Sequence, residues 1–129
     1  MIKISLLLIS IFSLLYGLVF SFAPYFFAEL TQAEPTNIAW LRNIGASICG
    51  VLFLGLLYVY QSPSKNYDLF MIITITSILQ TLGLIFSRFY NEFSAQNTLV
   101  IDFTIYSAIF VSLYFCLLYT SDAADEGLG

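Results

Sequence analysis

The chain contains no histidine, and only 9% of its 129 residues are charged. The absence of histidine removes the usual haem ligand, the commonest metal ligand and the commonest general base. The two cysteines, Cys49 and Cys116, lie in apolar stretches and show neither metal-ligand spacing nor a disulfide framework. We therefore expect two buried thiols, no metal and no cofactor. With four lysines and arginines in all, no nucleic-acid partner is expected.

Four apolar blocks occupy most of the chain, at residues 4–27, 39–60, 67–86 and 99–119. Each is about 20 residues long, the length that a helix needs to cross ~30 Å of hydrocarbon. With 60% hydrophobic residues, a soluble core of this size would not hide the apolar surface. Short links make consecutive helices antiparallel neighbours. The sequence predicts an all-α integral membrane protein, a four-helix bundle with up-down-up-down topology.

Residues 116–126 resemble, residue for residue, the translation of a transposase adapter used to prepare sequencing libraries. We therefore expect the four-helix domain to cover residues 1–115 and residues 116–129 to be non-native read-through. The alternative is a genuine acidic tail. The formal net charge is −4, and setting this segment aside leaves four basic and five acidic residues, a net charge of −1.

The first block resembles a secretory signal, because Lys3 precedes the apolar run and a small-x-small pattern ends it at residues 21–23. However, the apolar run is longer than in a typical signal, and Pro24 would directly follow the cleavage point. We expect the block to be retained as a membrane helix, with Pro24 near its end, where a lost hydrogen bond matters least.

The orientation in the membrane is indicated by few charges. The amino terminus, Lys3 and Lys65 fall at one membrane surface, and Arg42 and Arg88 fall at the other. Although the basic residues are nearly balanced, the free amino terminus and the early lysine favour cytoplasmic termini.

Small and polar residues recur at helix-packing spacing in three of the blocks. Such rows let helix backbones approach closely in lipid, and we interpret them as packing within the bundle, with homodimerisation as the alternative. Gln80 stands out because a buried amide in hydrocarbon needs a partner. It would either join helices or line a polar ligand site, and we favour the first. The rows are Ser13, Gly17 and Ser21; Gly45, Ala46, Cys49 and Gly50; and Thr76, Gln80, Gly83 and Ser87.

One cluster of charges is a candidate polar site. Arg42, Arg88 and Asp102 fall at the same membrane surface, near the ends of the second, third and fourth blocks. Each would anchor at the interface or seek a partner, and Asp102 also complements a helix N-terminus. A sharper hypothesis pairs Arg42 with Asp102 and leaves Arg88 available for an anionic or polar ligand.

A short pattern, mostly in the second block, is similar to one found in a known protein family. It resembles the second helix of DoxX-like and related small four-helix bacterial membrane proteins, which also carry a proline near the end of their first helix. The resemblance implies the fold and a location in the bacterial cytoplasmic membrane. Some DoxX relatives are tied to respiratory or thiol redox complexes, but this chain has no CxxC pair. The pattern comprises Ala23-Pro24, Trp40-Leu41-Arg42-Asn43-Ile44-Gly45-Ala46, Gly50 and Gly55.

Three functions remain open from the sequence. The first, which we favour, is a non-enzymatic accessory or interaction subunit of the membrane. The second is a small transporter or ligand-binding protein, although residues 4–22 lack the acidic residue with which four-helix multidrug exporters couple protons. The third is a redox-complex subunit that shapes a quinone or lipid site near Arg42 and Arg88. No nucleophile and base can be paired, so an enzyme is not expected.

Overall fold

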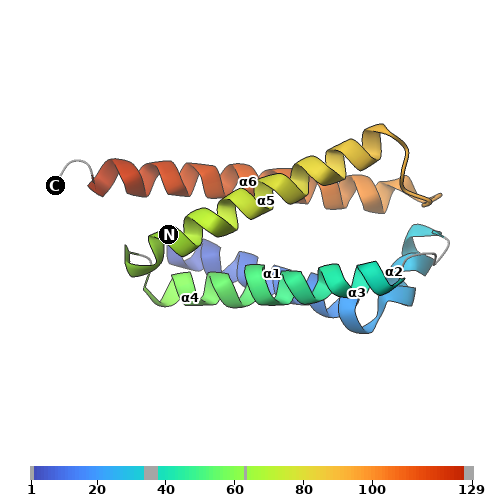
Figure 1. The fold of residues 1–129 in the computed structure, drawn as a ribbon, viewed down its shortest axis with the longest axis horizontal. Coiled ribbons are helices and arrows are strands. Elements are labelled where there is room, and N and C mark those ends of the chain that lie inside the picture. Colours follow the sequence, from blue (N-terminus) through green and yellow to red (C-terminus); the bar gives the residue numbers. More distant parts are fainter. Residues whose placement is uncertain (1, 34–37, 63, 127–129) are drawn as a thin grey trace.

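The computed structural model of the chain describes residues 2–33, 38–62 and 64–126. All regular structure in these ranges is helical. Four long passes alternate in direction, and α1 begins at the end of the molecule where α6 finishes, called here the terminal end (Figure 1). The predicted all-α, up-down-up-down bundle is confirmed.

The first pass is α1 (Ile2–Phe22), and a short helix, α2 (Pro24–Thr31), follows it. The second pass combines α3 (Ile38–Ser47), a π-helical segment η1 (Ile48–Leu54) and α4 (Gly55–Gln61). A single 3-10 turn, η2 (Ser64–Asn66), leads into α5 (Tyr67–Phe89). The last pass is α6 (Thr98–Glu126), which continues through the segment that resembles an adapter.

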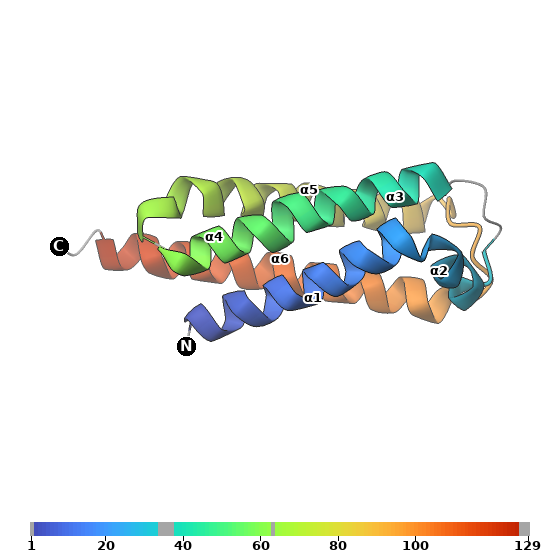
Figure 2. The ribbon, with the colours of Figure 1, turned by 90° about the horizontal axis from the view of Figure 1, so that it is seen from below.

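The prediction of one helix over residues 4–27 is wrong, because the first block divides at Ala23. Pro24 has no N–H to donate and its ring disfavours helical backbone at the residue before it. Ala23 accordingly leaves the helix, with φ −124° and ψ 47°, and Pro24 opens α2 as its first residue. The chain therefore turns at this end of the bundle, and α2 packs against α1, α3 and α6 instead of extending the first pass (Figure 2).

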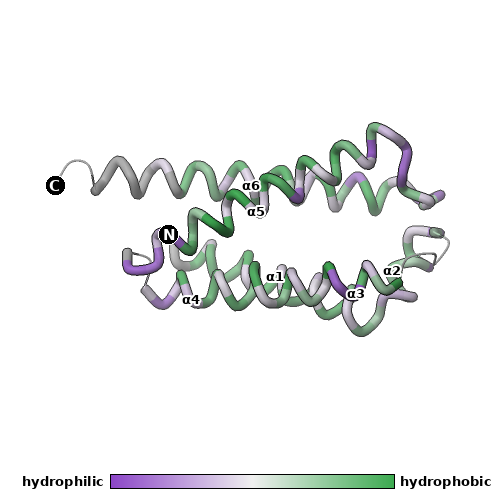
Figure 3. Tube along the Cα trace, in the orientation of Figure 1, coloured by the Kyte–Doolittle hydropathy of each residue, from purple (hydrophilic) through white to green (hydrophobic). Residues whose placement is uncertain are grey.

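Most residues along the four passes are apolar (Figure 3), and each pass exposes large hydrophobic side chains on its surface. Four segments are long and apolar enough to cross a membrane: Ile4–Phe22, Ile38–Gln61, Tyr67–Phe89 and Thr98–Leu118. Only 17–28% of the residues in their most apolar windows are buried inside the molecule. Because water would not tolerate so large an apolar surface, this is the architecture of a multi-pass membrane protein.

The main hydrophobic core lies in the half of the bundle next to the terminal end. Phe115 is its largest fully buried side chain, and its ring meets that of Phe70 edge-on, with centroids 5.5 Å apart. Side chains of α1, α4, α5 and α6 surround this pair: Leu6, Leu56, Val59, Ile73 and Leu118. Toward the other end, α5 diverges from α3 (Figure 1). The four passes are therefore packed together most closely at one end.

Small residues bring α1 and α3 into backbone contact. A Cβ placed on Gly45 would lie 2.5–2.8 Å from Ser21 Oγ, Ser21 N and Gly17 O. A Cβ placed on Gly17 would lie 2.4 Å from the sulfur of Cys49. Gly17 and Ser21 of the first row and Gly45 and Cys49 of the second therefore pack within the bundle, as predicted, whereas Gly50 is exposed and meets no neighbouring atom.

Candidate functional site at the bundle mouth

At the end of the bundle opposite the terminal end, two helices, α2 and α5, finish with the same kind of C-terminal turn. We call this end the mouth; it comprises α2 and residues 88–102. Gln32 after α2 and Asn91 after α5 are the two described non-glycine residues with positive φ, at 52° and 55°. Ala33 N donates to Ala28 O, and Glu92 N donates to Ser87 O, both at 2.9 Å. Each end is a Schellman motif, which turns the chain sharply while satisfying helix carbonyls.

The loop between α5 and α6 is bound to the C-terminus of α2. Asn97 N donates to Thr31 O at 3.0 Å, and the Asn97 side-chain amide donates to Leu30 O at 3.2 Å. Gln96 N donates to Gln32 O at 3.4 Å. The last carbonyls of a helix have no partner within it, so α2 offers these acceptors to the loop. The break at Pro24 therefore creates a separate helix, α2, whose C-terminus binds the α5–α6 loop and closes the mouth where the passes diverge.

Arg88 and Asp102 form a bidentate ion pair at the mouth. Arg88 Nε donates to Asp102 Oδ1 at 2.7 Å, and Nη2 donates to Oδ2 at 3.3 Å. Arg88 lies in the last turn of α5 and Asp102 in the second turn of α6, so the antiparallel helices bring them together. Their side chains remain 39% and 34% exposed. Two planar groups joined by two parallel bonds fix the relative position of the helix ends.

The predicted pairing of Arg42 with Asp102 is wrong, and so is the prediction that Arg88 stays unpaired. Arg42 Nη1 instead donates to the carbonyl of Ser21, near the C-terminus of α1. That carbonyl is available because the break at Ala23 ends the helical hydrogen bonding of α1. A cation at a helix C-terminus is also favoured by the helix dipole. The three predicted residues therefore serve two separate contacts.

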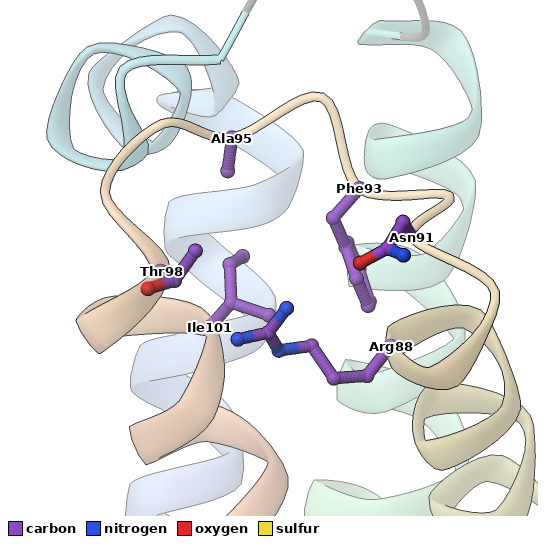
Figure 4. A pocket seen from close by; sticks show the side chains of 6 residues that line it. All are labelled: Arg88, Asn91, Phe93, Ala95, Thr98 and Ile101. Atoms are coloured by element: carbon purple, nitrogen blue, oxygen red, sulfur yellow. The ribbon is translucent and has the colours of Figure 1, made fainter.

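A small cavity lies beside the ion pair, with a volume of about 110 Å³. The Arg88 guanidinium extends across it beneath the loop that carries Asn91 and Phe93 (Figure 4). No hydrogen bond joins Arg88 Nη1 to another described residue, so this nitrogen remains able to donate. Because Asp102 balances the charge of Arg88, the cavity suits a neutral polar group better than a free anion. Its lining is completed by Ala95, Thr98 and Ile101.

Gln80 lies on the outer surface of α5, where its side chain is exposed. No hydrogen bond joins its amide to another described residue. The prediction that Gln80 joins helices within the bundle is therefore wrong. Ile73, two turns earlier on the same side of α5, packs against α4 at Gly55. Because α5 then diverges from the second pass, that side is uncovered when it reaches Gln80 (Figure 1).

Gln80 belongs to a stripe of small and polar residues along α5. The spacing of four, three and four residues places them on one side of the helix. Gly83 is fully open, since a Cβ placed there meets no atom within 4 Å. We call this stripe the Gln80 flank; it comprises Thr76, Gln80, Gly83 and Ser87.

Sequence reasoning missed a second polar contact between helices. Thr81 and Ser112 are both buried, and their hydroxyls are hydrogen-bonded at 2.9 Å between α5 and α6. Thr81 also donates to Ala108 O at 3.3 Å. Spacing along α5 offers a signal, because Thr74, Ser77 and Thr81 share the face that meets α6. This contact explains how α5 and α6 stay paired where the second pass no longer supports them.

Comparison of the chain with protein-family models, curated proteins and solved structures found no match. The resemblance to DoxX-like proteins therefore stays a prediction.

The ion pair can be tested by a double-mutant cycle. We expect Arg88→Ala and Asp102→Ala each to lower the thermal unfolding temperature in detergent, and the double variant to lose no more than the larger single loss. Arg42→Ala combined with Asp102→Ala should instead give additive losses, because these residues serve separate contacts. Additive losses for the Arg88 and Asp102 pair would contradict the assigned contact.

Proposed function

We propose that this protein is a non-enzymatic accessory or interaction subunit that binds another membrane helix through the Gln80 flank. The observation that carries the proposal is the position of Gln80, within a membrane-spanning segment and on the outer surface. Eight residues separate it from Arg88, which corresponds to a depth of roughly 12 Å at 1.5 Å per residue. This depth places the amide inside the hydrocarbon rather than at the headgroups.

An amide in lipid without a partner is costly, because hydrocarbon offers it no hydrogen bond. A neighbouring helix would remove this cost, and polar side chains commonly join transmembrane helices in this way. The flank also suits close approach, since Gly83 projects no side chain and the space around it is open. The Thr76 hydroxyl needs no partner from another helix, because it donates to Ile72 O at 2.8 Å within α5.

The proposal places the protein in a bacterial cytoplasmic membrane with both termini in the cytoplasm. It rests on Lys3 and Lys65 at the terminal end, since cytoplasmic loops carry an excess of basic residues. The lipid bilayer is then a partner along all four passes.

The mouth cavity favours a second candidate, a protein that holds the polar group of a quinone or a lipid. The free Nη1 of Arg88 offers a hydrogen bond to a neutral carbonyl oxygen, of a quinone or of a lipid ester, and Phe93 and Ile101 supply apolar lining. Quinone or phospholipid that copurifies with the chain and is lost from Arg88→Ala would favour this candidate over the first.

Site-specific photo-crosslinking tests the proposed interaction. A photoreactive phenylalanine analogue replaces Leu79, which is 64% exposed beside Gln80. We expect crosslinked protein in native membranes, and we expect Gln80→Leu to lower its yield about fivefold, the factor for a loss of about 1 kcal/mol.

The matched control carries the analogue at Phe110, which is 68% exposed on α6. Any crosslinks at this position should be unchanged by Gln80→Leu. If the yield at position 79 is also unchanged, or if no protein is crosslinked there, the Gln80 flank does not bind a partner.

A further inference from the structure

We propose that the partner of the Gln80 flank is a second copy of this chain, joined about a two-fold axis along α5. This inference rests on the proposed function and specifies which protein binds the Gln80 flank. The self-complementarity of the flank points to a second copy rather than to a different protein.

The polar chemistry of the flank is complementary to itself. The Gln80 amide carries a carbonyl oxygen that accepts and an NH₂ group that donates. Two such amides related by a two-fold axis form two equivalent hydrogen bonds, each donating to the other. None of the four residues of the flank is charged, so the flank does not require an oppositely charged partner. A two-fold contact uses the same patch on both copies, as in most homo-oligomers.

The shape of α5 permits the approach that these bonds require. Gly83 lies one turn after Gln80 and has open space where a side chain would be. Glycine at such a position lets two transmembrane helices come close enough for short side chains to meet. Gln80 and Gly83 are both exposed, so a second α5 can reach the flank at this level.

Cysteine crosslinking locates the contact. In a Cys49→Ala, Cys116→Ala background, Gly83→Cys is oxidised with copper phenanthroline in phospholipid vesicles. Facing glycines close to a two-fold axis fall within the Cα separation that a disulfide allows, so we expect a species of twice the chain mass. Gly50→Cys is the matched control, because Gly50 is equally open but lies on η1. Equal crosslinking of both variants would overturn the assigned face.

Energy transfer between donor-labelled and acceptor-labelled copies in phosphatidylcholine vesicles measures the association. We expect Gln80→Leu to weaken dimerisation about tenfold, equivalent to about 1.4 kcal/mol, and Gln80→Asn to retain much of it. Since the Gln80 side chain is exposed and makes no hydrogen bond with other described residues, the leucine variant should keep its thermal stability under dissociating detergent conditions.

The outcomes separate this inference from the proposed function. Absence of self-association, together with Gln80-dependent crosslinking of other proteins at position 79, would overturn the dimer and leave the proposed function standing. Self-association that Gln80→Leu does not weaken would overturn the dimer contact. Loss of every Gln80-dependent association would overturn both.

Discussion

Gly45→Val is expected to destabilise the protein by about 3 kcal/mol or more, the upper part of the range for overpacked sites. Even the first carbon of the new side chain would lie 2.7 Å from Ser21 N and 2.8 Å from Gly17 O. Backbone atoms cannot rotate away as a side chain can, so α1 and α3 must separate. Their separation would also remove the bond from Arg42 to the Ser21 carbonyl. Unfolding in a denaturing-detergent titration measures the loss.

Gly50→Val is the control for this substitution. It introduces the same β-branched side chain into the same pass, but its Cβ meets no atom within 4 Å. We expect a change within about 0.5 kcal/mol, as for an open surface site. If the two valine variants unfold at the same detergent fraction, the close crossing of α1 and α3 does not stabilise the fold.

Phe115→Ala is expected to cost about 2–3 kcal/mol, because it removes the largest fully buried side chain and its edge-on contact with Phe70. Water-soluble cores lose about 3–5 kcal/mol for this change. The loss should be smaller here because a helix that separates in the bilayer leaves Phe115 in lipid rather than in water. The same titration measures it.

Phe110→Ala provides the comparison on the same helix, since Phe110 is 68% exposed and Phe115 is 0% exposed. We expect it to retain nearly full stability, because its ring mainly contacts lipid. A loss at Phe110 equal to that at Phe115 would show that packing inside the bundle contributes little.

Most of the fold is predictable because its signals are local along the chain. The second block, expected at residues 39–60, occupies Ile38–Gln61, and the third, expected at residues 67–86, occupies Tyr67–Phe89. Hydropathy and length define a membrane helix without reference to its neighbours. The first block is the exception. Pro24 was expected to remove one hydrogen bond near the end of a continuous helix, whereas it moved Ala23 out of the helix and began a separate helix, α2.

The candidate site was predictable in composition but not in pairing. Arg42, Arg88 and Asp102 do lie toward the same end of the bundle, as the spacing of the blocks indicates. Which of them meet depends on how each helix is rotated and which ends converge, and the sequence gives no distances between helices. Gln80 shows the same limit, because its place in a row of small and polar residues predicted packing within the bundle. Only the divergence of α5 from the second pass leaves it uncovered.

The sequence by itself determined the number of passes, their alternating direction and the apolar character of the surface. These follow from block lengths and short links, because backbone groups in a bilayer must be satisfied within helices. Only the tertiary structure decided the Arg88–Asp102 pair, the bond from Arg42 to α1, the closure of the mouth by α2 and the exposure of Gln80. Each depends on the tilt and rotation of helices distant in sequence, which are set by packing between side chains rather than by hydropathy along one segment.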